Sequence, residues 1–478
     1  MTKANQRMET ALDNSAPVAD ERAKKPRATL TEGPIARTLV LFSLPIMASN
    51  VLQSLNASIN AAWIGHLLGT RALSASANAN SLLFFLLSIS VGLTMAATIL
   101  IGQGLGARDI ARTKRVMGTC IMFFGVVSFA IAIFGFAVAP HILQGMRTPP
   151  DAMPFASAYL RIIFLGVPAI FFLNFMMMAL RGAGDSRTPF YFMLISAGLD
   201  VALNPLLIRG FGPIPALGIA GSAWATTTAQ WFACILLIGW LYKSRHILRI
   251  GRGETKYLRF DGAVLRSLLT KGVPMGLQVV VVSSSMIFMI GLINGFGSLV
   301  VAAYGACFQL WNYIQMPAVA VGSAVSSMAA QNVGAGQWGR VNRIALVGII
   351  YNVLLTSALI AAVTLSDNAA FSLFLGGNMA AIAIAKHMHL LVSWSYVLFG
   401  IAFVLASVVR ATGAVVTPLL ILIVAIWGIR IPTAFFLSNS GVDGILWAFP
   451  AGSFASMVMT IAYYRYGSWR QAKMLTEG

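Results

Sequence analysis

Long uncharged stretches dominate this chain. No Asp, Glu, Lys or Arg occurs between Arg71 and Arg108, or between Lys271 and Arg340. Charged residues make up 10% of the 478 residues, whereas a soluble globular protein carries about 25%. A helix that crosses a bilayer needs about 20 mostly apolar residues. The sequence therefore predicts a polytopic membrane protein of the all-α class.

The apolar pattern predicts twelve spans in two groups of six. The basic segment 243–269 separates an N-lobe (34–242) from a C-lobe (270–465), with polar tails at 1–33, expected to be disordered, and at 466–478. The predicted spans lie near residues 37–65, 72–104, 115–139, 156–180, 189–208, 215–241, 270–294, 299–329, 343–365, 386–409, 418–438 and 442–464.

The two groups repeat one another. Residues 181–189 (RGAGDSRTP) return in part as residues 410–418 (RATGAVVTP), and residues 103–107 (QGLGA) return as 331–335 (QNVGA). Because each lobe has an even number of spans, both copies enter the membrane from the same side. The repeats are then related by a pseudo-two-fold axis along the membrane normal, an arrangement found in secondary transporters.

The positive charge is distributed asymmetrically. The net charge is +19, and 27 of the 33 Lys and Arg residues fall in segments on one side of the predicted topology. This bias places both termini and the linker in the cytoplasm. We therefore expect a multi-pass protein of the inner cell membrane that contacts lipid rather than nucleic acid.

Several short motifs resemble the multidrug and toxic compound extrusion (MATE) family over residues 36–465. They are GHLLG at 65–69, YLR at 159–161, GVP at 166–168, the 181–189 motif, NP at 204–205, GSAWAT at 221–226 and QNVGA at 331–335. The resemblance implies twelve helices in two bundles that form a V around a central cavity. It also implies a monomer that exports cationic or amphipathic compounds in exchange for protons or sodium, without any other cofactor.

Asp200 is the one acid predicted within a span. It lies eleven residues beyond Pro189, which is about 16 Å along a helix and near the middle of the bilayer. An ionised carboxylate at this depth costs several kcal/mol unless it is paired or hydrated. We therefore predict that Asp200 couples transport to a cation; the alternative is a polar residue that bonds neighbouring helices.

Four neutral polar residues are predicted to share the site with Asp200. Asn204 lies one helical turn beyond it, Asn56 and Asn60 share a face of the first span, and Thr226 lies at similar depth in the sixth. Such side chains hydrogen-bond a carboxylic acid or offer oxygens to sodium. The alternative for each of these residues, taken singly, is a hydrogen bond that joins two helices and has no part in coupling.

The pattern departs from the family at these positions. In one prokaryotic branch an aspartate matches Asn60, another often matches Asn204, and an asparagine matches Asp200. In this chain Asp200 is acidic while Asn60 and Asn204 are neutral. The exchange keeps one charge in the same chamber but moves it by about one turn, or 5–6 Å.

Aromatic, Met and Gln side chains are predicted to line a substrate cavity, where stacking and dispersion suit flat hydrophobic cations. Their alternative role is packing. The candidates are Phe84, Phe85, Met286, Met289, Phe308, Trp311, Gln278 and Gln309. Arg430, Arg181 and Pro45 are assigned structural or gating roles, and Arg181 and Arg410 are expected to reach lipid headgroups or cap helices.

The function expected from these features is multidrug efflux by alternating access. An enzyme is not predicted, because the spans contain no Walker A pattern, HExxH or Ser-His-Asp set. No metal site is predicted either. A flippase for a lipid-linked precursor is the alternative, but it needs a strongly cationic cavity, for which Arg430 is the one clear candidate.

Overall fold

The computed structural model describes residues 30–145, 148, 153–210, 212 and 215–475, apart from seven side chains between residues 70 and 89. The N-terminal half forms α2 (Ile35–Leu68), α3 (Thr70–Gly106), α4 (Ile110–Gly145), α5 (Met153–Gly182), α6 (Arg187–Arg209) and α7 (Ile219–Lys243). The C-terminal half forms α8 (Gly262–Ile293), α9 (Ser298–Gly334), α10 (Trp338–Leu365), α11 (Asp367–Leu375), α12 (Met379–Val392), α13 (Ser395–Arg410), α14 (Val416–Ile423), the π-helix η4 (Val424–Arg430), α15 (Ile431–Leu437) and α16 (Val442–Tyr466). No strand occurs in these ranges, so the all-α prediction is confirmed.

Most of these helices are suited to cross a membrane. Within the described residues, ten are long and apolar enough, and α12 with α13, bent by 44° at their junction, makes an eleventh. α9 is not among them, although it is 37 residues long; most of its residues are buried in the protein. Together with α9, the helices follow the order of the twelve predicted spans.

Two segments differ from the prediction in their bounds. α8 begins at Gly262, where the Asp261 side chain accepts hydrogen bonds from the first backbone N–H groups, so the connection between the halves is shorter than predicted. It contains the short helix η2 (Arg252–Tyr257). The predicted tenth span begins earlier, at Met379, and bends after Val392. Hydropathy alone detects neither a capping residue nor a bend.

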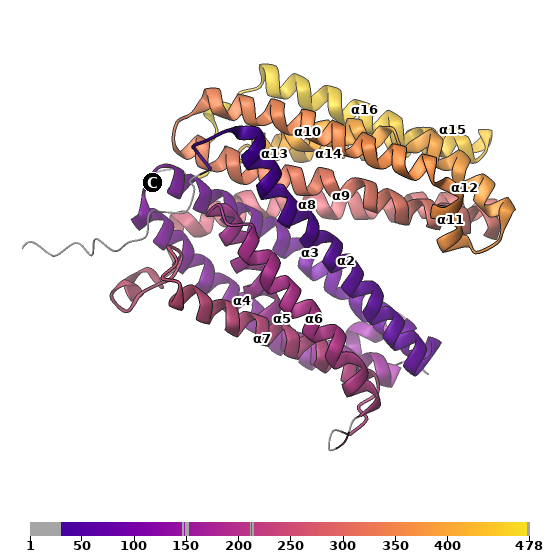
Figure 1. Ribbon diagram of the computed structural model, residues 1–478, viewed down its shortest axis with the longest axis horizontal. Coiled ribbons are helices and arrows are strands. Elements are labelled where there is room, and N and C mark those ends of the chain that lie inside the picture. Colours follow the sequence, from indigo (N-terminus) through magenta and orange to yellow (C-terminus); the bar gives the residue numbers. More distant parts are fainter. Residues whose placement is uncertain (1–29, 146–147, 149–152, 211, 213–214, 476–478) are drawn as a thin grey trace, which may run out of the picture.

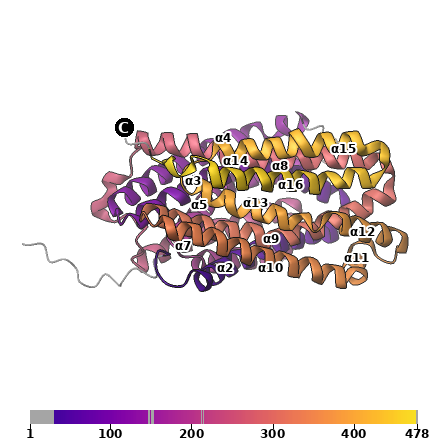
Figure 2. The ribbon, with the colours of Figure 1, turned by 90° about the horizontal axis from the view of Figure 1, so that it is seen from above.

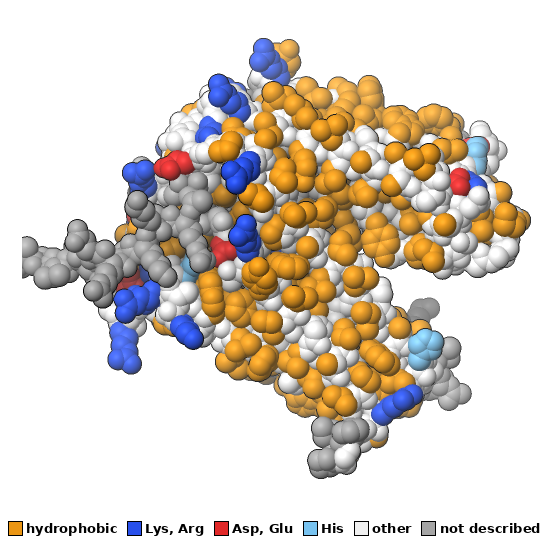
Figure 3. Space-filling view, viewed as in Figure 1, with side chains coloured by type: hydrophobic (Ala, Val, Ile, Leu, Met, Phe, Trp, Pro, Cys, Tyr) orange, Lys and Arg blue, Asp and Glu red, His pale blue; other side chains and the backbone are white. Residues whose placement is uncertain are grey.

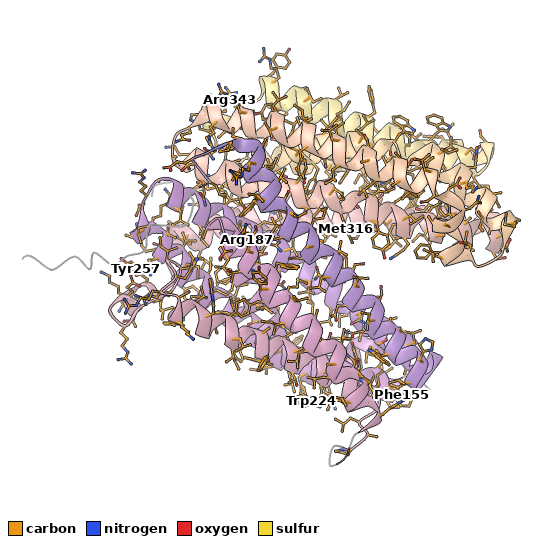
Figure 4. The ribbon with its side chains drawn as sticks, in the orientation of Figure 1. Phe155, Arg187, Trp224, Tyr257, Met316 and Arg343 are labelled. Atoms are coloured by element: carbon orange, nitrogen blue, oxygen red, sulfur yellow. The ribbon has the colours of Figure 1, made fainter. Side chains whose placement is uncertain are left out.

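The helices form two bundles, which we call the N-lobe (α2–α7) and the C-lobe (α8–α16) (Figure 1). In both lobes the helices run along the length of the molecule (Figures 1 and 2). The lobes meet at the end where Lys and Arg side chains gather, and a notch divides them at the other end (Figure 3). We call these the basic end and the open end; Tyr257 and Arg343, labelled in Figure 4, lie toward the basic end.

α2 connects the two lobes. It contacts α9 and α10 of the C-lobe and α6 and α7 of the N-lobe, and it runs diagonally from one bundle to the other (Figure 1). Pro45 lies within α2, toward its first turns. A proline removes one backbone hydrogen bond and allows a helix to bend, so α2 contains a flexible point before it reaches the N-lobe.

Glycines let α3 and α9 approach each other closely at the basic end. A Cβ added to Gly106 would lie 1.9 Å from the Gln331 carbonyl oxygen, and one added to Gly334 would lie 2.1 Å from the Gln103 carbonyl oxygen. Because real Cβ atoms do not approach a carbonyl this closely, any larger residue would push the lobes apart.

Two glutamines hold the same interface. Gln103 on α3 donates its side-chain amide to the Ala411 carbonyl at 2.7 Å, and Gln331 on α9 donates to the Gly182 carbonyl at 2.8 Å. All four groups are buried or nearly so, and each bond crosses from one lobe to the other. The sequence repeat therefore appears in space as a reciprocal pair of bonds.

The outermost described residues at both ends of the chain pack against the basic end. The predicted N-terminal tail lies mostly outside the described residues, but Leu30 is buried and exchanges hydrogen bonds with Gln331 and Asn332. In the predicted C-terminal tail, Trp469 is buried and its carbonyl accepts from Thr412 at 2.8 Å. The described parts of both tails are thus packed, contrary to the expectation of a disordered segment reaching residue 33.

Candidate functional site

Asp200 lies inside the N-lobe, 2% exposed, in the middle of α6. Asn204, one turn further along the same helix, is fully buried. Since α6 packs against α2 and α7, the side chains of three helices reach this carboxylate.

Four donors bind the carboxylate of Asp200, two on each oxygen. Oδ2 accepts from the amides of Asn60 at 2.7 Å and Asn56 at 2.9 Å. Oδ1 accepts from the Asn204 amide and the Thr226 hydroxyl, both at 3.0 Å. Every residue predicted to share this site is therefore in direct contact with Asp200. The partners in these contacts are all neutral, so hydrogen bonds rather than a counter-charge stabilise the ionised form.

Two amide oxygens beside Asp200 have no partner. They are the Oδ1 atoms of Asn56 and Asn204, both buried. The third amide is different, since Asn60 Oδ1 accepts from Asn204 at 3.1 Å. The Asp200 carboxylate thus has two donors on each oxygen, and two neutral amide oxygens beside it are free. These free oxygens would accept the proton of the protonated acid or bind a small hard cation.

A glycine contact brings Thr226 within reach of α6. A Cβ on Gly221 of α7 would lie 2.3 Å from the Leu207 carbonyl oxygen of α6, so only glycine permits this approach. Trp224, labelled in Figure 4 toward the open end of the N-lobe, lies two residues before Thr226. The GSAWAT motif therefore supplies both the close contact and the hydroxyl.

Tyr159 is a neighbour that the sequence did not assign to the site. It is buried on α5 near Asp200, and its hydroxyl interacts with the Asn80 side chain. It belongs to the YLR motif at 159–161, but nothing in the spacing of that motif points to α6.

The C-lobe contains a small cavity next to Arg430. The cavity has a volume of about 50 Å³, and its lining includes the polar residues Arg430, Gln315, Ser395, Tyr396, Ser453 and Ser456. Arg430 ends the π-helix η4, is 9% exposed and lies 3.5 Å above the Phe449 ring. Its Nε and Nη2 atoms have no hydrogen-bond partner.

Some predicted cavity residues are placed differently. Met286 lines the C-lobe cavity, whereas Met289 and Trp311 are 0% and 1% exposed and belong to the C-lobe core. Trp311 packs against Phe449 at 5.7 Å and Tyr396 at 6.3 Å between ring centres. These two residues are packing residues here, because neighbouring helices cover the faces that were expected to meet a substrate.

The remaining predicted cavity residues do not converge. Phe84 is 59% exposed on α3, Phe308 is half-buried, and the side chain of Phe85 lies outside the described residues. The Gln309 amide donates to the Tyr313 hydroxyl at 3.3 Å, and Gln278 accepts from Arg410 at 3.1 Å. Both glutamines are therefore engaged within the C-lobe.

The two repeated arginines at helix ends differ in their surroundings. Arg410 is 3% exposed and bonds Gln278 and Ser407, so of its two predicted roles, reaching headgroups or capping a helix, the first is wrong. Its counterpart Arg181 is half-buried and contacts the Met178 sulfur at 3.5 Å. Both lie next to the carbonyls that accept the interlobe glutamine bonds, which is consistent with a structural role at this interface.

Comparison with known proteins identifies relatives over nearly the whole chain. The profile of the MatE family matches residues 45–206 and 274–436. The probable multidrug resistance protein YoeA of Bacillus subtilis (strain 168) is 35% identical over 470 residues, covering 98% of this chain and 99% of that protein. YpnP of the same strain, also described as a probable multidrug resistance protein, is 33% identical over 94% of this chain and 98% of its own length.

The fold also matches solved transporter structures. One example, an outward-facing conformation of a multidrug resistance MATE family transporter, superimposes with a TM-score of 0.85 at 20% identity. The match covers 93% of this chain and 98% of that chain. The two matched segments of the family profile lie one in each lobe and begin 229 residues apart, the spacing between the motifs at 181–189 and 410–418.

Proposed function

The chain belongs to the MatE family of multidrug efflux transporters, and on that premise we propose that it is a secondary active antiporter that exports cationic or amphipathic organic compounds in exchange for protons. Sodium is the alternative coupling ion. The observation that carries the proposal is the buried Asp200 carboxylate, saturated by four neutral donors on three helices. We further propose that the basic end faces the cytoplasm of a cell whose inner membrane holds the protein.

Protonation would change the bonding of Asp200. The ionised carboxylate has two donors on each oxygen, so an added proton must displace one of them and find an acceptor. Asn56 is suited to this exchange, because its Oδ1 is free and its amide makes only one bond to the cluster. Rotation of that amide would turn a donor into an acceptor for the acidic proton.

The exchange would alter how α2 is held. Asn56 and Asn60 attach α2 to the carboxylate on α6, while the first turns of α2 lie against the C-lobe. Weakening this attachment frees the N-lobe part of α2 to bend at Pro45 or shift. Proton binding would thereby favour one of two arrangements of the lobes, as alternating access requires.

Sodium would use the same group of oxygens differently. Asp200 and the free amide oxygens of Asn56 and Asn204 would form part of an oxygen shell. The flippase alternative has less support, since Arg430 is the only charged residue among the described residues that line the C-lobe cavity.

The first test is export of ethidium from cells that contain wild type or Asp200→Asn protein at equal membrane levels. The proton gradient is kept intact and then collapsed in the presence of sodium. We expect export by wild type only, and its loss on collapse of the gradient. Asp443→Asn is the matched control, because Asp443 is an exposed acid at the open end that contacts only His387 in the described structure. Equal export by Asp200→Asn would overturn the proposed role of Asp200.

A further inference from the structure

An apolar groove lies on the surface of the N-lobe where α4, α5 and α7 meet. Its volume is about 280 Å³. Ala132 of α4 and Pro168 of α5 are buried and form its floor, whereas Phe129 and Ile133 are 54% and 72% exposed and form its rim. The lining residues of α4 are spaced as 129, 132, 133 and 136, so they occupy one face of that helix.

Arg161 lies at one end of this groove. On α5 it precedes Leu165 by about one turn and Pro168 by two, so the three residues share a face. Arg161 is exposed, and its guanidinium lies 5.6 Å from the centre of the Phe136 ring, which lines the groove. In the described part of the chain Arg161 forms neither a hydrogen bond nor an ion pair. The sequences of α4, α5 and α7 contain no acid, so these helices offer no counter-charge.

We propose that the groove holds one acyl chain of an anionic phospholipid from the leaflet at the open end, and that Arg161 binds the phosphate of that lipid. The lipid site requires only that the protein spans a membrane, and it is independent of the coupling role proposed for Asp200.

The depth of Arg161 in the bilayer suits a phosphate. α5 has 30 residues and begins at Met153, near Phe155, which is labelled toward the open end in Figure 4. The helix is about 45 Å long, and about 7 Å extends beyond each side of a 30 Å hydrocarbon core. Arg161 is eight residues, about 12 Å, from the start of α5. Its side chain points toward the start of the helix and therefore reaches back to the headgroups.

The groove itself lies deeper than Arg161, where acyl chains are. Leu165 and Pro168 are four and seven residues further along α5, which is about 6 and 10 Å toward the middle of the bilayer. An empty groove would lose dispersion contacts along its walls. A phospholipid with its phosphate on Arg161 would place an acyl chain at this depth and restore these contacts.

The lining of the groove favours a hydrocarbon chain over an exported cation. Trp231 is its one residue with a polar side-chain atom, and the indole N–H already donates to the Leu165 carbonyl at 3.2 Å. A drug-sized compound is usually held by several placed polar groups in addition to apolar walls. Arg161 would also repel a cation, whereas it attracts a phosphate.

The repeat shows that the fold does not require a cation at this position. The residue 229 positions after Arg161 is Leu390, which lies on α12 and is 60% exposed. An apolar residue is the ordinary choice for a surface that faces lipid, since a charge there is costly. The arginine is therefore specific to the N-lobe, where it lies beside the groove.

The test measures quenching of Trp231 fluorescence by phospholipids whose acyl chains carry bromine. Purified full-length protein is placed in phosphatidylcholine vesicles, and a small fraction of the lipid is replaced by brominated phosphatidylglycerol or by brominated phosphatidylcholine with the same chains. The difference between each protein and its Trp231→Phe form isolates the signal of Trp231. We expect phosphatidylglycerol to quench at about 5-fold lower fraction, the preference that one basic residue near the membrane surface supplies.

Arg161→Gln should make the two brominated lipids equally effective. Its unchanged quenching by phosphatidylcholine would show that the variant is folded. Arg161→Lys keeps the charge and should keep most of the preference. The matched control is Arg209→Gln, which removes an exposed arginine at the end of α6 and should behave like wild type. Ala132→Leu fills the floor of the groove and should reduce quenching by both lipids.

Three results would overturn the lipid site. The first is equal quenching of the wild type by both lipids, and the second is a preference that survives Arg161→Gln. The third is recovery of Trp231 fluorescence on addition of tetraphenylphosphonium, because displacement of the lipid by an organic cation would assign the groove to a transported compound. None of these results bears on export driven through Asp200, which the ethidium assay measures separately.

Discussion

Gln103 and Gln331 make the same hydrogen bond in opposite directions across the lobe interface. Each donates its side-chain amide to a carbonyl that follows a repeated arginine, Ala411 for Gln103 and Gly182 for Gln331. The two bonds cross the interface near the close contacts of Gly106 and Gly334. This arrangement closes the basic end, and it must be broken before that end can open.

Gln103→Ala should therefore favour opening at the basic end. The change leaves the buried Ala411 carbonyl without its donor, which costs about 1–3 kcal/mol in the closed arrangement only. A cysteine at the buried position Ser327, in a variant lacking the three native cysteines, should react faster with a maleimide. Gln331→Ala should have a similar effect, and the exposed Gln337→Ala none. Unchanged labelling in both interface variants would contradict a role of these bonds in closure.

Gly106→Ala should disturb the same interface by steric overlap. Its Cβ would lie 1.9 Å from the Gln331 carbonyl oxygen, and overpacking of this kind typically costs about 1–3 kcal/mol. The thermal unfolding midpoint should fall by several degrees. Gly125→Ala in α4, where no atom lies within 4 Å of the added Cβ, is the matched control. A midpoint equal to that of wild type would show that the interface accommodates the added Cβ without loss of stability.

Asn60→Ala should destabilise the protein more than Asn56→Ala. Asn60 donates to Asp200 and also accepts from Asn204, whereas Asn56 makes only the bond to Asp200. A buried hydrogen bond to a charged group contributes about 1.5–3 kcal/mol, and the Asn60 variant loses a second bond as well. Thermal unfolding of the two variants under identical conditions measures the difference, and the reverse order would show that the network is bonded differently.

The connection between the lobes should loosen in acid. Burial opposes ionisation of Glu254, but the Gly251 backbone N–H and the Lys114 ammonium outweigh it and hold the pKa of Glu254 below its ordinary value. Because the pKa is lowered in the folded state, the stabilisation is present above the ordinary value and is lost as the pH falls through the lowered one. Hydrogen exchange of residues 244–261 should therefore speed up in that acidic range.

Glu254→Gln removes this titration. The variant should show faster exchange of residues 244–261 at neutral pH and no further step in acid. The effect is small, because the Glu254 side chain is 37% exposed and solvent screens its 2.7 Å ion pair with Lys114. An acid step that persists in the variant would assign the loosening to another group.

The polar cluster around Asp200 could be predicted because it depends on periodicity and depth. Asn56 with Asn60, and Asp200 with Asn204, are one helical turn apart, and a polar group inside a span must find partners within the protein. Their convergence follows from the small number of polar residues available at that depth. Tyr159 could not be assigned to the site in this way, because a tyrosine can pack as an apolar residue and its neighbours come from other helices.

The cavity residues could not be predicted in the same way. Trp311 and Met289 have the composition of a substrate surface, but the same side chains fill a core. For Trp311, only the packing of α9 against α12 and α13 and the contact with the Phe449 ring distinguish the two. The hydrogen bonds between the lobes could not be predicted either. The repeat of Gln103 and Gln331 is visible in the sequence, but their acceptors are backbone carbonyls, which every residue carries.

The reciprocal glutamine bonds have a consequence for how such a chain could arise. Two identical half-length chains related by a two-fold axis would form both bonds from one glutamine and one carbonyl, as an isologous dimer does. Such a dimer must carry the same charge at both equivalent positions. Joining the halves in one polypeptide removes that constraint, so that one half can hold Asp200 and the other, one residue from the matching position, Arg430. The link between the halves therefore permits a transporter whose interior is electrically polar from one side to the other.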